Sequence, residues 1–452
     1  MKSASLLLCI ILLFSCQPKK ENTGQPQVVF KSVNVIPMDQ EHVLENQDVV
    51  VSMGKIVEVG ESGQVTYNDD ATIVDASGKY LIPGLAEMHA HVPPIDDMEP
   101  MKEVLSLFLV KGITTIRGML GHPLHLELRK MVNMGEVLGP HFYTTGPSFN
   151  GNTVKTAEEG AQRVRDQKAA GYDYLKMHPG LVPETFAAVT TTANELGIPF
   201  VGHVSFDVGI DRAIEAGYSS IDHMDGIVEG LVPNIEEIGE QGNGLFAIYS
   251  SPLADTSRIP EIIQGLKEKD IWMVPTQSLA ERWMFPVEAD FHLNSPEMKY
   301  MNQQILDNWR KAKDGLLADE RYNADKVKNY IALRRKLIYE CQQNGVGILL
   351  GSDAPQIFNV PGFSAHYELK NLVDAGLTPF EALQTGTINV ADYLNKDNEG
   401  IIQAGAVSDL VLLNANPLED ITNTQAIEAV MIGETYLPKD SINAMLEKLA
   451  KR

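Results

Sequence analysis

The sequence predicts an α/β protein: a (β/α)8 barrel, also called a TIM barrel, with a small discontinuous β-sandwich domain made from both chain ends. Three observations indicate this fold. Short apolar runs alternate with amphipathic helical stretches from about residue 86, strand-like segments without helices flank that region, and five runs end in a metal-ligand residue. In a parallel barrel the carboxyl ends of the strands meet at one mouth, where active sites lie. Residues far apart in sequence are therefore expected to converge there.

Eight segments have the composition and length of barrel strands, and most gaps between them hold a helical pattern such as ETFAAVTTTANELG. The segments are GLAEMHAH, GITTIRGM, HFYTTGP, YDYLKMH, PFVGHVS, SSIDHMD, IWMVPTQS and GILLGSD. A doubly wound open sheet is the alternative for such alternation. That sheet would not explain candidate ligands that extend from the first strand to the last.

The pattern divides the chain into consecutive parts. Residues 28–85 are strand-like and punctuated by Gly, Asn and Asp, as expected for the first part of the β-sandwich domain. The barrel follows over 86–398, with a helical insertion at about 280–344 that is either a lid or a peripheral addition. The second part of the sandwich is expected at 399–440 and a terminal helix at 441–452.

The first sixteen residues have the pattern of an export signal. Lys2 precedes an apolar run at 6–14, which is too short to span a bilayer and is typical of a signal peptide. Leu13-Phe14-Ser15-Cys16 resembles a bacterial lipobox, which implies lipidation of Cys16; a plain signal peptide is the alternative. Residues 17–27 then form a tether. We therefore expect a protein anchored in the bacterial cell envelope by lipid rather than by a transmembrane span.

The composition narrows the class of partner. The chain is 44% hydrophobic and 21% charged, an ordinary globular balance, and its net charge is -23. This acidity argues against nucleic-acid binding, which requires a surface rich in lysine and arginine. We expect a small-molecule substrate, and the sequence leaves the oligomeric state open, a homo-oligomer included. Cys341 is the only cysteine beyond the signal and lipobox positions, and we expect it to be a buried structural thiol.

Four histidines and one aspartate are candidate metal ligands. His89 and His91 lie two residues apart at the end of the first strand, so both imidazoles share one face. His203 and His223 end strands five and six, and Asp353 ends strand eight. A lone histidine at such a place is usually a hydrogen-bonded core residue. Several of them on the strands of one barrel favour a metal centre.

Lys176 ends strand four and has two interpretations. An ordinary lysine is a poor ligand because its ammonium is positive, and a lysine at the barrel rim usually extends to solvent. Burial among cationic groups would release the proton more easily. The free amine could then take up carbon dioxide, and the carboxylated Lys176 would be able to bridge two metals.

Together these residues resemble the ligand set of the amidohydrolase superfamily, in its imidazolonepropionase and metal-dependent prolidase (Xaa-dipeptidase) branch. The flanking stretches agree: MGKIVEVG, YLIPGLAEMHAH, GITTIRG, LLGSDAP, HYELKNLVDAGLTPFEALQTGTINVADYL and GAVSDLVLLNANPLED. The resemblance implies that His89, His91 and Asp353 hold a buried metal. It implies that His203 and His223 hold a more exposed one and that carboxylated Lys176 bridges the two. Zinc is the expected ion, as one or two ions, with manganese and iron as alternatives.

The chemistry expected from this set is metal-assisted hydrolysis of a carbon–nitrogen bond. Asp353 is expected to take the proton of the attacking water and pass it to the leaving amine, and His223 to help stabilise the oxyanion. Lactone or phosphotriester hydrolysis is the alternative on the same ligands, and a non-catalytic binding lipoprotein is a further one. Candidate substrate contacts are His178, Arg117, His141, Tyr143 and His366.

Overall fold

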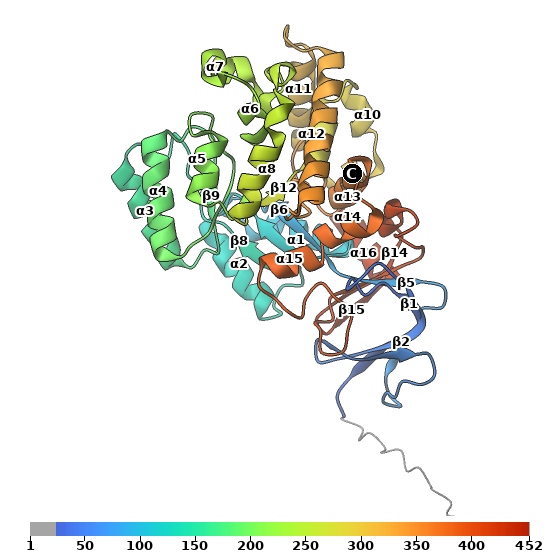
Figure 1. The fold of residues 1–452 in the computed structure, drawn as a ribbon. Helices are drawn as coiled ribbons and strands as arrows, with labels where there is room; N and C mark the ends of the chain where they lie inside the picture. Colours follow the sequence, from blue (N-terminus) through green and yellow to red (C-terminus); the bar gives the residue numbers. More distant parts are fainter. Residues whose placement is uncertain (1–23, 452) are drawn as a thin grey trace, which may run out of the picture.

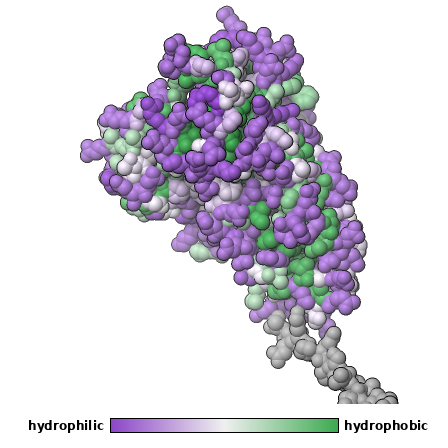
Figure 2. All heavy atoms as spheres, viewed as in Figure 1, coloured by the Kyte–Doolittle hydropathy of each residue, from purple (hydrophilic) through white to green (hydrophobic). Residues whose placement is uncertain are grey.

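We describe residues 24–451 of a computed structural model, so the predicted signal peptide and Cys16 lie outside the described residues. The chain forms a barrel surrounded by helices, with a smaller sheet beside it (Figure 1). Polar side chains cover most of the visible surface of the barrel, whereas apolar residues gather over part of the small sheet (Figure 2). In the described part, none of the helices is both long enough and apolar enough to cross a membrane.

Seven of the eight predicted barrel strands are regular. They are β6 (Leu85–Ala90), β7 (Ile113–Gly118), β8 (His141–Thr144), β9 (Leu175–Met177), β10 (Phe200–Gly202), β11 (Ser220–Asp222) and β12 (Trp272–Val274). All neighbouring pairs within β6–β7–β8 and within β9–β10–β11–β12 are parallel. Nearly every residue of these strands is buried, which explains their continuous apolar runs.

Irregular bridges close the ring at two places. Thr145 bridges Tyr174 and Phe149 bridges Met177, which connects β8 to β9. The predicted eighth strand forms single parallel bridges instead of a regular strand: Ile348 pairs with Met273, and Ala354 pairs with Ala90. The segment cannot stay extended because Asp353 adopts a left-handed backbone with φ 64°. The barrel is nevertheless closed, and the predicted fold class is confirmed.

Helices return the chain between strands on the outside of the barrel. They are α1 (Met98–Val110), α2 (Pro123–Asn133), α3 (Ala157–Ala170), α4 (Pro183–Leu196), α5 (Gly209–Ala216), α8 (Ile259–Glu268), α12 (Ala324–Asn344), α13 (Phe363–Asp374) and α14 (Pro379–Thr385). Local signals in the sequence set their ends. For example, α3 begins with a capping box between Thr156 and Glu159 and ends at Gly171, whose φ is 89°.

Two insertions extend the loops at the carboxyl ends of β11 and β12. The first, which the sequence did not predict, contains α6 (Ile227–Gly230), α7 (Ile235–Asn243) and three single-turn helices, Leu245–Ala247, Ser251–Leu253 and Thr256–Arg258. The second lies within the predicted region and contains α9 (Gln277–Met284), α10 (Ala289–Leu293), the turn Pro296–Tyr300 and α11 (Gln303–Leu317).

The small domain joins the first and last strands of the described residues in one hydrogen-bonded sheet. Its strands are β1 (Gln27–Val35), β2 (Leu44–Ser52), β3 (Lys55–Glu61), β4 (Thr72–Asp75), β5 (Tyr80–Pro83), β13 (Leu410–Leu413), β14 (Ile427–Ile432) and β15 (Thr435–Pro438). The order is β15-β14-β13-β5-β1-β2-β3, with β4 beside β1. The antiparallel β5–β13 pair connects the two halves. Helix α15 (Ile388–Tyr393), the turn Ile421–Gln425 and α16 (Lys439–Leu449) complete the described part.

Candidate metal centre

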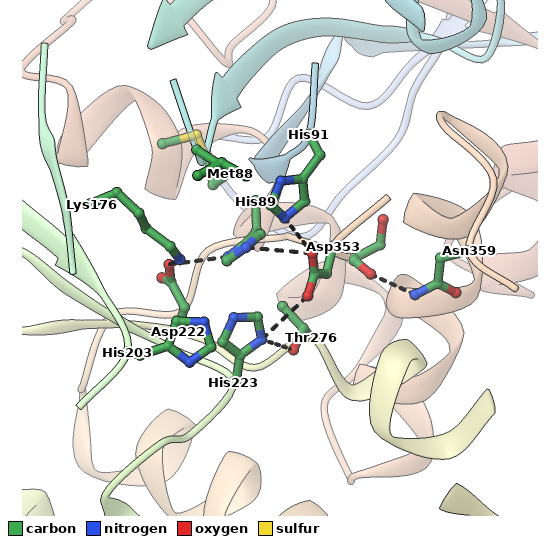
Figure 3. A network of polar contacts seen from close by, with 12 residues as sticks. Met88, His89, His91, Lys176, His203, Asp222, His223, Thr276, Asp353 and Asn359 are labelled. Atoms are coloured by element: carbon green, nitrogen blue, oxygen red, sulfur yellow. Dashed lines mark hydrogen bonds and ion pairs between the residues drawn. The ribbon is translucent and has the colours of Figure 1, made fainter. Parts of the chain in front are cut away.

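The six predicted ligands converge at the carboxyl end of the barrel (Figure 3). Nε2 of His91 lies 2.7 Å from Oδ1 of Asp353, and Nε2 of His89 lies 3.5 Å from the same oxygen. Nδ1 of His223 lies 3.6 Å from Oδ2 of Asp353. Ligand atoms of His89, His223 and Asp353 all lie within 4.8 Å of one another, which is compact enough to surround one ion.

His203 and Lys176 extend this cluster toward the neighbouring strands. The ring centroid of His203 is 4.4 Å from that of His223, so the two imidazoles that end β10 and β11 are in contact. Nζ of Lys176 is fully buried and has no hydrogen-bond partner in the described part of the chain. Burial lowers the pKa of Lys176, which favours the uncharged amine.

Gly202 makes room for the Lys176 side chain. Its φ is 118°, and a Cβ there would lie 2.5 Å from the Met177 carbonyl oxygen, 2.9 Å from Cδ of Lys176 and 3.1 Å from its Nζ. Any side chain at position 202 would therefore push on the predicted ligand from the adjacent strand.

Hydrogen-bond partners that the sequence pattern did not predict orient two of the imidazoles. Nδ1 of His203 lies 2.5 Å from Oδ2 of Asp225, and Nδ1 of His223 lies 2.9 Å from Oγ1 of Thr276. In each ring this leaves Nε2 available to a metal. Asp225 follows His223 by only two residues, so the run IDHMD did contain this signal; Thr276 could be found only from the fold.

The protonation state of three buried candidate ligands suits metal binding. Burial lowers the pKa of His89, His203 and His223 well below the ordinary value, because a charged imidazole is poorly solvated there and cationic neighbours repel it. A neutral imidazole keeps a lone pair on one nitrogen, which is the form that binds a metal.

Strained backbone lies at the same strand ends. His223, Thr276 and Asp353 have φ values of 62°, 46° and 64°, in the left-handed region that non-glycine residues rarely occupy. Such conformations cost on the order of 1–3 kcal/mol each and persist where surrounding contacts enforce them. Here they turn each side chain into the mouth, which marks this region as functional.

The residues present fit a divalent cation. Two buried polar atoms beside the candidate ligands have no hydrogen-bond partner among residues 24–451: Nζ of Lys176 and Nδ1 of His178. Buried polar groups are normally satisfied, so this concentration is unusual. Imidazole and carboxylate donors around one space are the ligand chemistry of zinc and related ions.

The insertion after β11 covers part of this cluster. The ring of Phe246 stacks on His223 with a centroid distance of 5.1 Å and on His203 at 6.2 Å. The carbonyl of Phe246 accepts a hydrogen bond from Tyr330 of α12 at 2.7 Å. The apolar cover over the two histidines therefore comes from this unpredicted insertion.

Among the predicted substrate contacts, only His178 lies beside the ligand cluster. Its ring stacks on His203 with a centroid distance of 4.9 Å. The prediction for Arg117 is wrong because its guanidinium is buried inside the barrel and donates to the Met88 carbonyl, Tyr393 and Ser220.

Three further substrate predictions are also wrong. His141 begins β8, at the opposite end of the barrel, and its Nε2 lies 2.8 Å from Oδ2 of Asp409. Tyr143 packs against the small buried cluster of Met119, Tyr174 and Val201 inside the barrel. His366 is buried on α13, and its nitrogens contact the Lys111 carbonyl and Thr424. The period of a strand or helix predicts which face a side chain lies on, but it does not predict how far along the barrel axis that side chain lies.

The amidohydrolase family model matches residues 80–435 of the chain. The chain therefore belongs to the amidohydrolase family. A sequence relative is imidazolonepropionase of Geobacillus sp. (strain WCH70), which is 26% identical over 414 residues covering 83% of this chain and 86% of that protein. Adenine deaminase of Chelativorans sp. (strain BNC1) is 32% identical over 264 residues, covering 54% of this chain and 42% of that protein.

Solved structures show the same fold. A putative prolidase from Bifidobacterium longum superposes with a TM-score of 0.68 at 22% identity, covering 94% of this chain and 99% of that one. A Xaa-Pro dipeptidase with bound methionine gives a TM-score of 0.66 at 18% identity, covering 91% of this chain and 100% of that one. These structures show that the fold is shared, and the family match confirms the predicted membership of the amidohydrolase superfamily.

Proposed function

We propose that this amidohydrolase uses a divalent metal to hydrolyse an amide or peptide-like bond in a small substrate. The single observation that supports this most strongly is the convergence of His89, His91, His203, His223 and Asp353 with Lys176 at one barrel mouth. These residues come from five different strand ends, and imidazoles gathered around a carboxylate match a metal hydrolase site.

The proposed roles are those that the resemblance to the amidohydrolase superfamily implies. His89, His91 and Asp353 would hold one ion, and His203 and His223 a second one, with Lys176 between the two groups as an amine or a carbamate. A bound ion of this kind supplies Lewis-acid polarisation and lowers the pKa of water to about 7. We propose zinc because of the nitrogen and oxygen donors. Asp353 would accept the proton of the attacking water and deliver it to the leaving nitrogen, and His223 would assist with the developing oxyanion.

The names of the relatives suggest candidate substrates for this protein. Imidazolonepropionase, adenine deaminase and Xaa-Pro dipeptidase are named for different carbon–nitrogen substrates. His178 is the proposed substrate contact, because its ring borders His203 and its buried Nδ1 has no partner among the described residues.

A side-by-side assay tests the reaction class. The zinc-loaded protein is given dipeptides, N-acyl amino acids, lactones and phosphotriesters under identical conditions. We expect amide or peptide turnover that disappears when a chelator removes the metal and returns when zinc is restored. Turnover of lactones or phosphotriesters alone would contradict the proposed bond specificity. Turnover that persists in the presence of the chelator would contradict the proposed requirement for a metal.

We also propose that the protein is exported and lipid-anchored through Cys16. The apolar run at 6–14, whose last two residues begin the segment Leu13-Phe14-Ser15-Cys16, supports this proposal. In cells fed a radiolabelled fatty acid, the wild-type protein should carry label and fractionate with membranes, whereas Cys16→Ser should carry none. Unlabelled wild-type protein would refute the anchor.

A further inference from the structure

Asp222 is a fully buried carboxylate that lies beside Lys176 and His89 in the candidate metal centre (Figure 3). Its Oδ2 lies 3.0 Å from Nδ1 of His89 and 3.6 Å from Nζ of Lys176. One oxygen thus contacts two predicted ligands that come from strands on different sides of the barrel. Asp222 is adjacent to His223 in sequence, but the predicted ligand pattern does not require a carboxylate at position 222.

The other oxygen of Asp222 is held from below. Oδ1 accepts a hydrogen bond from Oγ of Ser220 at 3.2 Å and from a terminal guanidinium nitrogen of Arg117 at 3.4 Å. Arg117 is fixed in turn by the Met88 carbonyl and by Tyr393 of α15, both at 2.8 Å. A buried column therefore runs from α15 through Arg117 and Asp222 to the predicted ligands.

Asp222 lies on the side of His89 that faces away from Asp353. The Nδ1 of His89 faces Asp222, whereas its Nε2 faces Asp353 at 3.5 Å. A proton on Nδ1 that points to Asp222 leaves the lone pair on Nε2, where the candidate ligands gather. Asp222 therefore does not share the cluster of His89, His223 and Asp353 but contacts it through the opposite edge of the ring.

We propose that Asp222 is a positioning residue that fixes the tautomer and orientation of His89, and the direction of the Lys176 side chain, for metal binding. Carboxylates behind metal-binding histidines restrict ring rotation and increase ligand basicity, and their loss typically lowers metal affinity about 10–100-fold. Arg117 then holds the Asp222 carboxylate in place, and this role accounts for the position of Arg117 deep in the barrel. The inference rests on the proposed metal centre but not on any particular substrate.

The test measures metal binding instead of turnover. Zinc affinity is determined by competition with a chromogenic chelator, and the visible spectrum of the cobalt-substituted protein reports the ligand set. We expect Asp222→Asn to weaken zinc binding about 10–100-fold and to change the cobalt spectrum. Asp173→Asn is the matched control, because Asp173 pairs with Arg129 at 2.5 Å on the partly exposed periphery and should leave both readouts unchanged.

A second variant separates positioning from folding. Asp222→Asn leaves the Arg117 guanidinium buried without its counter-charge, which destabilises the fold. The double variant Arg117→Met/Asp222→Asn removes both charges, so it should recover thermal stability while its zinc affinity stays low. Recovery of zinc affinity together with stability would overturn the proposal, as would wild-type affinity in Asp222→Asn. A wild-type protein that binds no zinc would instead refute the metal centre itself.

Discussion

At the scale of the residue, Asp353 shows how backbone and side chain cooperate. Its N–H donates to the His89 carbonyl at 3.0 Å, and its left-handed φ of 64° turns the carboxylate toward three imidazoles. In a strand that continued regularly, successive side chains would point to opposite faces of the sheet. The departure from strand geometry is therefore what brings the proposed proton carrier to the centre.

Replacing this carboxylate tests its proton role. We expect Asp353→Asn to lower kcat by at least about 10²–10⁴-fold, because an amide cannot take the proton of water, while part of the bound metal remains. Steady-state kinetics and metal analysis of the same sample measure both quantities. Asp397→Asn, at an exposed position, is the control. An unchanged kcat would exclude Asp353 as the proton carrier.

Gly202 provides a second prediction at this scale. In Gly202→Ala the new Cβ meets the Met177 carbonyl at 2.5 Å and Lys176 at 2.9 Å, so the strand or the lysine must shift. We expect a loss of about 1–3 kcal/mol in unfolding free energy together with weaker metal binding. Gly171→Ala is the matched control: its φ is also positive, at 89°, but a Cβ there meets nothing within 4 Å. Equal metal binding in both variants would argue against the steric role.

At the scale of the element, helix α12 fixes the strand ends that carry the site. Arg334 is buried and donates to the His223 carbonyl at 2.7 Å, the Pro275 carbonyl at 2.8 Å and Gln277 at 2.9 Å. These carbonyls belong to the irregular turns after β11 and β12, where ladder hydrogen bonds have ended. One side chain thus replaces the partners that the strained turns lack.

Two adjacent arginines allow a matched test of that anchoring. Arg334→Met should lower the unfolding free energy by at least about 3 kcal/mol, because two buried carbonyls lose charged donors. Arg335→Met removes a pair with Glu281 that is partly exposed, so it should cost about 1 kcal/mol or less. Urea unfolding of both variants provides the comparison. Similar losses in the two variants would show that Arg334 does not anchor the turns.

At the scale of the whole molecule, segments from both ends of the described chain, residues 24–451, join one sheet. The small sheet pairs β5 with β13, and buried His366 of α13 connects the Lys111 carbonyl after α1 to Thr424 before β14. Burial lowers the pKa of His366 to about 3. The folded protein therefore keeps this imidazole neutral at pH values where the unfolded chain protonates it.

The consequence for stability has a definite sign. Between pH 6.5 and about 3 the unfolded state binds the extra proton, so the contribution of His366 to unfolding free energy falls as the pH falls. The limiting slope is about 1.4 kcal/mol per pH unit. In His366→Gln the stability should depend less steeply on pH between 6.5 and 5, as measured by chemical denaturation. Identical slopes in wild type and variant would refute a neutral buried His366.

The sequence determined the barrel, the small domain from both ends and the candidate ligand set. Each of these depends on a local regularity: buried parallel strands are continuously apolar, and ligands follow directly where those strands end. The same reasoning failed for Arg117, His141 and Tyr143. Strand period gives the inward face, but the depth of a residue along the barrel depends on strand tilt and stagger, which are properties of the closed ring.

Only the tertiary structure decided which groups support the ligands and what covers them. Asp222, Thr276 and Phe246 contact the imidazoles across the barrel or from an insertion, through spacings that have no sequence period. The irregular eighth strand had the same origin, because its backbone follows contacts with β6 and β12. Local pattern selects the elements, whereas the free energy of each buried polar group depends on partners that only the folded chain brings within hydrogen-bonding distance.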